Sequence, residues 1–201
     1  IIDEKGNVLN GEEIIFIFAK HYLYEKKIKK GSVLVTNEVA NHGLDIALKK
    51  LGLKLKRVKV GDKNILKEIL DNKYFFGGEP SGHFIFKDDI LIGDGMATAI
   101  RLLTIILKEK KKLSVLRNGI DLLEELNINQ RIDRERFYLN QESIYKKLNI
   151  LLKNLDIYYN IRPSGTEPLL RVNLQYHKRN IKVITLNKLK KQIIKVISDA
   201  C

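Results

Sequence analysis

Short apolar segments alternate with helical patterns through the first half of the chain. Apolar or alternating residues at 32–36 and 53–60 predict strands, and the segments around them carry apolar residues at helical spacing. Asn10 stands before the first helical segment, with Glu12 and Glu13 in its first turn, which is typical of a capped helix start. Because strands that alternate with helices favour parallel pairing, we expect a mostly parallel sheet covered on both faces.

Two further features complete this half. Apolar residues at 75–76 and 84–86 predict a strand on each side of the polar stretch 77–83. A helix then opens at Gly93-Asp94-Gly95 and carries apolar residues at helical spacing, namely Ala97, Ile100, Leu103 and Leu107. Asp94 between two glycines is also the composition of a metal or phosphate site, but we interpret it as a helix cap.

The second half has its own cycle of elements. We expect strands at 126–132, 157–161 and 169–174 and helices at 141–152 and 186–197. Between Lys108 and Ser114, charged residues interrupt the apolar periodicity, which indicates a domain boundary. The predicted fold class is therefore α/β, with a three-layer, mostly parallel sheet domain followed by a small α+β domain.

Composition narrows the function classes. The 201 residues are 44% hydrophobic, no apolar run reaches membrane-spanning length, and the first residues lack a secretory pattern, so we expect a cytoplasmic globular protein with no membrane partner. Cys201, the single cysteine, excludes an internal disulfide framework. The net charge of +13 raises the question of nucleic acid. The lysines are spread over nearly every segment without interleaved aromatic residues, so we expect no nucleic-acid partner.

Two polar loops carry the candidate chemistry. The first groups the carboxylate of Glu79, the hydroxyl of Ser81 and the imidazole of His83 where ligands of parallel sheets collect, although an imidazole beside Phe84 could simply be packed. The second loop contains residues suited to gripping a phosphate group: Arg162, Ser164, Gly165 and Thr166. It lacks the lysine and the spacing of a P-loop, and taken alone it also reads as a polar turn.

The chain resembles the α-D-phosphohexomutase superfamily, most closely its bacterial phosphoglucosamine mutase branch. The resemblance lies in the two polar loops, in Gly93-Asp94-Gly95-Met96 and in the segments 3–8, 47–52 and 60–62. Members of that superfamily have four domains, with a phosphorylated serine in the first and a magnesium-binding aspartate loop in the second. Neither the serine loop nor the aspartate loop occurs in this sequence. The resemblance implies a remnant of the preceding domain at 1–10, the sugar-binding domain III at 11–112 and the phosphate-binding domain IV at 113–201.

The resemblance also implies roles. Glu79 and Ser81 would bind sugar hydroxyls, and the loop with Arg162 would hold the phosphate that does not react. His83 and Lys63 are candidates for proton transfer or charge stabilisation. The implied reaction is an isomerisation between glucosamine 6-phosphate and glucosamine 1-phosphate in amino-sugar and cell-wall precursor synthesis. It would proceed through a phosphoserine and a bisphosphorylated sugar, with Mg²⁺ bound by the missing N-terminal half; alone, this chain would be inactive.

Some residues depart from the family pattern and keep alternatives open. Pro80 stands where the glucosamine branch commonly has glutamine, so a phosphoglucomutase or phosphomannomutase is the second hypothesis. His42 lies in a segment unlike the family sequence, and we expect a surface or capping role for it rather than a catalytic one. A third hypothesis, of another class, is a phosphosugar-binding or interaction module without catalysis.

Overall fold

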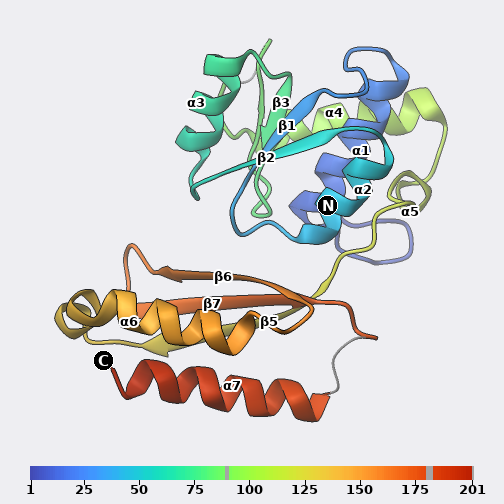
Figure 1. Ribbon diagram of the computed structural model, residues 1–201. Coiled ribbons are helices and arrows are strands. Elements are labelled where there is room, and N and C mark those ends of the chain that lie inside the picture. The colour runs from blue at the N-terminus through green and yellow to red at the C-terminus, as the bar shows by residue number, and fades with distance from the viewer. Residues whose placement is uncertain (89–90, 180–182, 201) are drawn as a thin grey trace. The chain divides into compact units, whose positions relative to one another are not determined.

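The computed structural model describes residues 1–88, 91–179 and 183–200, so Cys201 lies outside the described residues. The chain forms two compact units, Ile1–Leu122 and Leu123–Cys201 (Figure 1). The division falls later than the boundary expected at 112/113, because Leu113 and Leu116 of the short helix α5 (Leu113–Leu116) are buried in the core of the first unit. Assignment of the units to family domains stays a prediction.

A four-stranded sheet organises the first unit. Its strands are β1 (Val33–Asn37), β2 (Lys54–Val58), β3 (Phe76–Gly78) and β4 (Phe84–Phe86), in the order β2-β1-β3-β4. The β1 strand pairs in parallel with β2 and β3, whereas β4 is antiparallel to β3. The predicted mostly parallel sheet is confirmed.

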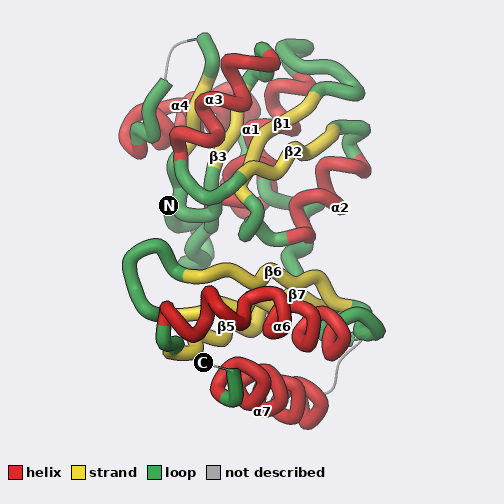
Figure 2. The backbone as a smooth tube through the Cα atoms, turned by 60° about the vertical axis from the view of Figure 1, so that its left-hand side comes forward, coloured by secondary structure: helices red, strands yellow, loops and turns green. Residues whose placement is uncertain are grey.

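Helices cover both faces of this sheet (Figure 2). The helices are α1 (Gly11–Tyr24), α2 (His42–Lys50), α3 (Asp62–Asn72) and α4 (Gly95–Glu109). One face, with α1, α2 and α4, holds the larger apolar cluster, which includes Phe76, Phe84 and Phe86. On the other face, α3 packs Ile65 and Ile69 into a smaller cluster. The three-layer prediction is therefore confirmed.

The α1 helix forms the centre of the first unit. Asn10 caps it as predicted: its side chain accepts a hydrogen bond from the Glu13 backbone, and the Glu13 side chain accepts one from the Asn10 backbone. Phe18 is fully buried and contacts the rings of Tyr22, Phe76, Phe84 and Phe86. This aromatic cluster supports the two strands that flank the polar stretch 77–83.

The α4 helix starts as predicted but buries a different face. The Asp94 side chain accepts hydrogen bonds from the backbone N–H groups of Met96 and Ala97, which confirms the capping interpretation. The buried residues are Thr98, Leu102 and Ile105, whereas the stripe chosen from spacing is mostly exposed, with Ile100, Leu103 and Leu107 all more than half exposed. The helix is apolar on two faces, so spacing alone could not identify the inner one.

The ion pairs of Glu25 should make the stability of the folded protein depend on pH. Glu25 accepts hydrogen bonds from Lys108 (2.9 Å), and Lys27 lies 3.1 Å away. The contact with Lys108, followed by that with Lys27, lowers the pKa of Glu25 to about 2. Because the folded-state pKa lies below the ordinary 4.5, this stabilisation is complete above about pH 4.5 and is lost as the pH falls towards 2. We expect Glu25→Gln to lower the melting temperature at pH 7 but not near pH 2; an equal loss at both would contradict this origin.

The second unit is a three-stranded antiparallel sheet with two helices, α6 (Arg134–Leu152) and α7 (Val183–Ser198). Its strands are β5 (Glu124–Arg131), β6 (Ile157–Pro163) and β7 (Leu169–Tyr176), in the order β5-β7-β6. Apolar residues of the sheet and both helices form one separate core. The α6 helix begins earlier than predicted because Asp133 caps it and Phe137 is buried in its first part. None of the helices among the described residues is long and apolar enough to cross a membrane.

Candidate functional site

The first candidate loop leaves the sheet at the carboxyl end of β3. Parallel pairing brings the carboxyl end of β1 to the same edge, and Thr36 there donates a hydrogen bond from Oγ1 to the carbonyl of Gly78 (2.8 Å). Glu79 comes directly after Gly78, so its side chain starts at the edge where ligands of such sheets collect.

The two carboxylate oxygens of Glu79 have different hydrogen-bond partners. Glu79 Oε1 accepts two hydrogen bonds, one from the side-chain amide of Asn37 and one from the backbone N–H of Gly61, both at 3.0 Å. Its Oε2 accepts one from the hydroxyl of Ser81 at 3.3 Å. Glu79 is only 6% exposed, so these contacts are needed to satisfy a buried carboxylate.

His83 shares this cluster. Its Nδ1 lies 3.2 Å from Ser81 Oγ and 3.7 Å from Glu79 Oε2, and the His83 side chain is 53% exposed. Half-exposure argues against simple packing of the imidazole in the core. A methyl group on Gly93 would lie 2.7 Å from the His83 ring, so the glycine before the α4 cap makes room for it. The structure thus brings together Glu79, Ser81 and His83.

The backbone of the loop is closed by its own hydrogen bonds. The Glu79 N–H donates to the carbonyl of His83 and the Gly82 N–H donates to the carbonyl of Glu79, each at 2.9 Å. Gly82 has φ +95°, a conformation that L side chains rarely adopt. From outside the loop, the Gly11 N–H donates to the carbonyl of Pro80 at 3.2 Å. The start of α1 therefore holds the loop in place.

Gly11→Ala is expected to disturb this junction. A Cβ at Gly11 would lie 2.1 Å from the carbonyl oxygen of Glu79, which belongs to backbone that cannot move cheaply. We expect a loss of about 1–3 kcal/mol in the free energy of unfolding of the first unit, measured by chemical denaturation. Gly95→Ala is the matched control, because nothing lies within 4 Å of its added Cβ. Equal behaviour of the two variants would contradict the close approach.

Lys63 lies apart from the carboxylate cluster. It is exposed in the first turn of α3, and its backbone N–H is bonded to Asp62. Its side chain makes no hydrogen bond or ion pair with any residue that the structure describes. Among the described residues, Lys63 is linked to Glu79 through Gly61, two residues earlier, whose N–H donates to Glu79 Oε1. The role of Lys63 stays a prediction.

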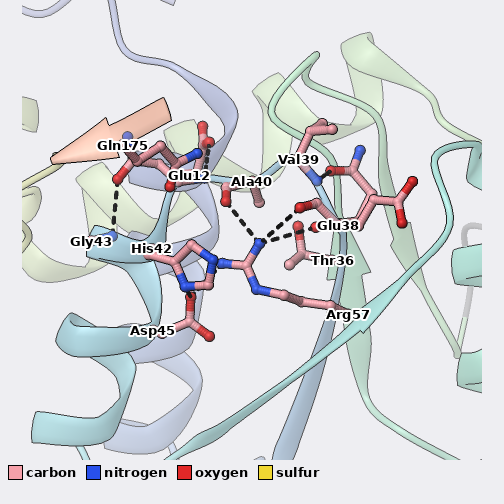
Figure 3. Close-up of polar contacts among 12 residues, drawn as sticks. Glu12, Thr36, Glu38, Val39, Ala40, His42, Gly43, Asp45, Arg57 and Gln175 are labelled. Carbon is pink, nitrogen blue, oxygen red and sulfur yellow. Dashed lines mark hydrogen bonds and ion pairs between the residues drawn. The ribbon is translucent and has the colours of Figure 1, made fainter. Parts of the chain in front are cut away.

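A second polar network supports the turn after β1 (Figure 3). The guanidinium of Arg57 donates from Nη1 to the carbonyl of Ala40 at 2.7 Å, with the carbonyls of Asn37 and Glu38 at 3.4 and 3.5 Å. Its Nη2 pairs with Asp45. Sequence reasoning missed Asn37, Gly61 and Arg57; the available signal for Asn37 was its place at the end of a predicted strand.

His42 belongs to this network. It is the first residue of α2, and its Nδ1 lies 3.4 Å from Asp45. Burial, followed by the positive charge of Arg57, lowers the pKa of His42, although Asp45 acts in the opposite direction. Asn41, not His42, caps the helix through its side chain. These contacts give His42 a structural environment at the helix start.

The second candidate loop lies in the second unit, between β6 and β7. Ser164 is buried; its N–H donates to the carbonyl of Leu169 (2.8 Å), and its hydroxyl accepts from the Glu167 N–H (3.3 Å). Gly165 and Thr166 are exposed, and a Cβ on Gly165 would meet nothing within 4 Å. The side chain of Arg162 makes no hydrogen bond or ion pair with any described residue. The loop is thus closed by its backbone and leaves a guanidinium and a hydroxyl available.

Neither loop provides a metal centre. Within the described ranges, no three His, Cys, Asp or Glu side chains lie where they could hold a metal ion together. The NH₂ group of Asn37 and the N–H of Gly61 both donate to Glu79 Oε1, so this carboxylate faces hydrogen-bond donors where a magnesium site would place further oxygen ligands. The site therefore does not fit magnesium.

Comparison with protein families matches residues 10–121 to the model "Phosphoglucomutase/phosphomannomutase, alpha/beta/alpha domain III". Two curated relatives are phosphoglucosamine mutases. The protein of Clostridium botulinum (strain 657 / Type Ba4) is 39% identical over 98% of this chain and 44% of its own length. The protein of Ruminiclostridium cellulolyticum is 37% identical over 98% of this chain and 43% of its own. The chain therefore spans less than half the length of these relatives.

Solved structures give the same fold. An N-acetylglucosamine-phosphate mutase of the alpha-D-phosphohexomutase superfamily, in its substrate complex, matches with a TM-score of 0.77 at 16% identity, over 98% of this chain and 45% of that one. The Aspergillus fumigatus N-acetylphosphoglucosamine mutase in complex with GlcNAc-6P and magnesium matches with a TM-score of 0.76 at 14% identity, over 100% and 46%. At these identities the likeness concerns the fold alone.

Proposed function

Because the chain belongs to the phosphoglucomutase/phosphomannomutase family, we propose that it supplies the sugar-binding and phosphate-binding loops of a cytoplasmic phosphohexomutase acting on glucosamine phosphates. The relatives named phosphoglucosamine mutase support the choice of sugar. The observation that carries the proposal is the cluster of Glu79, Ser81 and His83 at the carboxyl edge of the sheet, with hydrogen-bonding groups within 3.7 Å of one another.

Each loop has a proposed task. Glu79 accepts hydrogen bonds from sugar hydroxyls and Ser81 accepts or donates one, since both side chains have capacity beyond their present contacts. Arg162, Ser164, Gly165 and Thr166 hold the phosphate that does not react, with Arg162 supplying the charge. Phosphoryl transfer depends mainly on positioning and charge stabilisation, so two rigid binding loops contribute directly to the rate of the complete enzyme.

His83 is the proposed proton-transfer or charge-stabilising residue. Both of its described contacts use Nδ1, which leaves Nε2 for a ligand. Lys63 is a second candidate for charge stabilisation, because its ammonium group is exposed and unpaired among the described residues. A phosphoserine and magnesium would come from the remainder of the mutase, and magnesium would neutralise phosphate charge there. Domains III and IV correspond in this proposal to the two compact units.

The proposal is tested by titrating this chain with glucosamine 6-phosphate in a calorimeter. We expect measurable binding, weaker binding of glucose 6-phosphate and mannose 6-phosphate, and no conversion to the 1-phosphate. Preference for glucose or mannose would favour a phosphoglucomutase or phosphomannomutase, the second candidate that Pro80 suggests. Appreciable turnover would contradict the proposed need for the serine and magnesium loops. If no hexose phosphate binds, the assignment of the loops fails.

A further inference from the structure

Asn37 is a buried amide with both of its ends engaged. It ends β1 and is 3% exposed. Its Oδ1 accepts a hydrogen bond from the backbone N–H of Val39 at 3.2 Å, and its Nδ2 donates to Glu79 Oε1 at 3.0 Å. An N–H group can only donate, so the contact with Val39 fixes which end of the amide is oxygen. The NH₂ group must then face Glu79.

The consequence for Glu79 is a choice between its two oxygens. Oε1 is occupied by two N–H donors, from Asn37 and Gly61. Oε2 is the oxygen on the side of the two groups that face a ligand, 3.3 Å from Ser81 Oγ and 3.7 Å from His83 Nδ1. A carboxylate held at one oxygen by two donors cannot rotate without breaking both hydrogen bonds. Glu79 therefore presents Oε2 in one orientation.

The position of Asn37 is itself determined by its neighbours. The hydroxyl of Thr36, one residue earlier, fastens the end of β1 to the end of β3 through the Gly78 carbonyl. Beyond it, the guanidinium of Arg57 donates hydrogen bonds to carbonyls of the turn 37–40, and Asp45 forms an ion pair with the same guanidinium (Figure 3). The Asn37 amide thus lies between a strand end that Thr36 stabilises and a turn that Arg57 stabilises.

We infer that Asn37 is a positioning residue for sugar binding: it orients the Glu79 carboxylate so that Oε2 meets the sugar hydroxyl. The inference rests on the proposed function, because it concerns the same carboxylate. It goes further by giving a specific task to a residue outside the loop 77–83. Asn37 does not itself touch the sugar, so its whole effect on binding passes through Glu79.

Binding measurements with three variants test this task. We expect Asn37→Ala to weaken glucosamine 6-phosphate binding about tenfold, in line with the loss of a hydrogen bond to a charged group. Asn37→Asp keeps the size and the acceptor for Val39 but places a second carboxylate against Glu79, so a larger loss is expected. The control Asn72→Ala removes an exposed asparagine of α3 and should leave the affinity unchanged. Equal affinity of all variants and wild type would overturn the inference.

A double-mutant cycle separates positioning from general stability. In a Glu79→Ala background, Asn37→Ala should change the affinity less than twofold, because the carboxylate through which Asn37 acts is no longer present. A full tenfold effect in that background would show that Asn37 acts by another route and would overturn the inference.

The Gly61 amide provides a readout that needs no ligand. Its N–H shares Glu79 Oε1 with Asn37, so a rotated carboxylate releases it. In NMR spectra we expect Asn37→Ala and Asn37→Asp to shift the Gly61 amide resonance and to accelerate its hydrogen exchange, with most other resonances unchanged. An unchanged Gly61 amide would overturn the inference even if sugar affinity fell. Failure of the wild-type chain to bind any hexose phosphate would instead count against the proposed function, and the Gly61 result would still decide the positioning of Glu79.

Discussion

Phe18→Ala is expected to destabilise the first unit strongly and to leave the stability of the second unit unchanged. Phe18 is fully buried, and its ring lies 5.2 Å from that of Phe86 and 5.8 Å from that of Phe84. Removing a buried phenyl ring costs about 3–5 kcal/mol, which is a large part of the 5–15 kcal/mol typical of a whole domain. Because the second unit has its own apolar cluster, the loss should stay local.

Hydrogen exchange read by mass spectrometry distinguishes the two units. Peptides from Ile1–Leu122 should lose protection in Phe18→Ala, whereas peptides from Leu123–Cys201 should keep it. Phe137→Ala is the matched control, because Phe137 is fully buried in the core of the second unit and should give the reverse pattern. Loss of protection in both units of either variant would contradict separate cores.

The order of elements was predictable because each has a local signal. Asn10 and Asp94 cap helices where the sequence places them, and the apolar runs become the strands of the first sheet. The inner face of α4 was not predictable, because Leu102 and Leu103 are chemically equal and only tertiary packing decides which is buried. The boundary after Leu122 was missed for a similar reason: burial of α5 depends on contacts far away in the chain.

The candidate site also contains residues that could be predicted from the sequence and residues that could not. Glu79, Ser81 and His83 lie within five residues of one another, so sequence reasoning could group them. The donors that hold Glu79 come from Asn37 and Gly61, on two other segments, and only the parallel sheet brings them together. A single sequence can place Asn37 at the end of a strand, but it does not show which side chain on another segment Asn37 contacts. It therefore identifies the groups proposed to meet a ligand more readily than the groups proposed to orient them.

Binding and stability should separate in Arg162→Ala. Arg162 lies opposite Arg171 in the pairing of β6 with β7, and the guanidinium of Arg171 is already paired with Glu167 at 2.5 Å. The charge of Arg162 is therefore available to a phosphate, whereas its neighbour's is not. Like charges on paired strand positions are unfavourable, so removing Arg162 should leave the free energy of unfolding unchanged or slightly higher.

The expected effect on binding is large. Loss of hydrogen bonds to a charged group costs about 1.5–3 kcal/mol, which corresponds to an affinity for inorganic phosphate and glucosamine 6-phosphate about 10- to 150-fold lower. Arg162→Lys should recover part of it, because an ammonium keeps the charge but not the two-pronged geometry. Arg136→Ala, which removes an exposed arginine from α6, controls for the change in net charge. If Arg136→Ala weakens phosphate binding as much as Arg162→Ala does, the basic surface as a whole attracts phosphate and the loop at 162–166 does not bind it specifically.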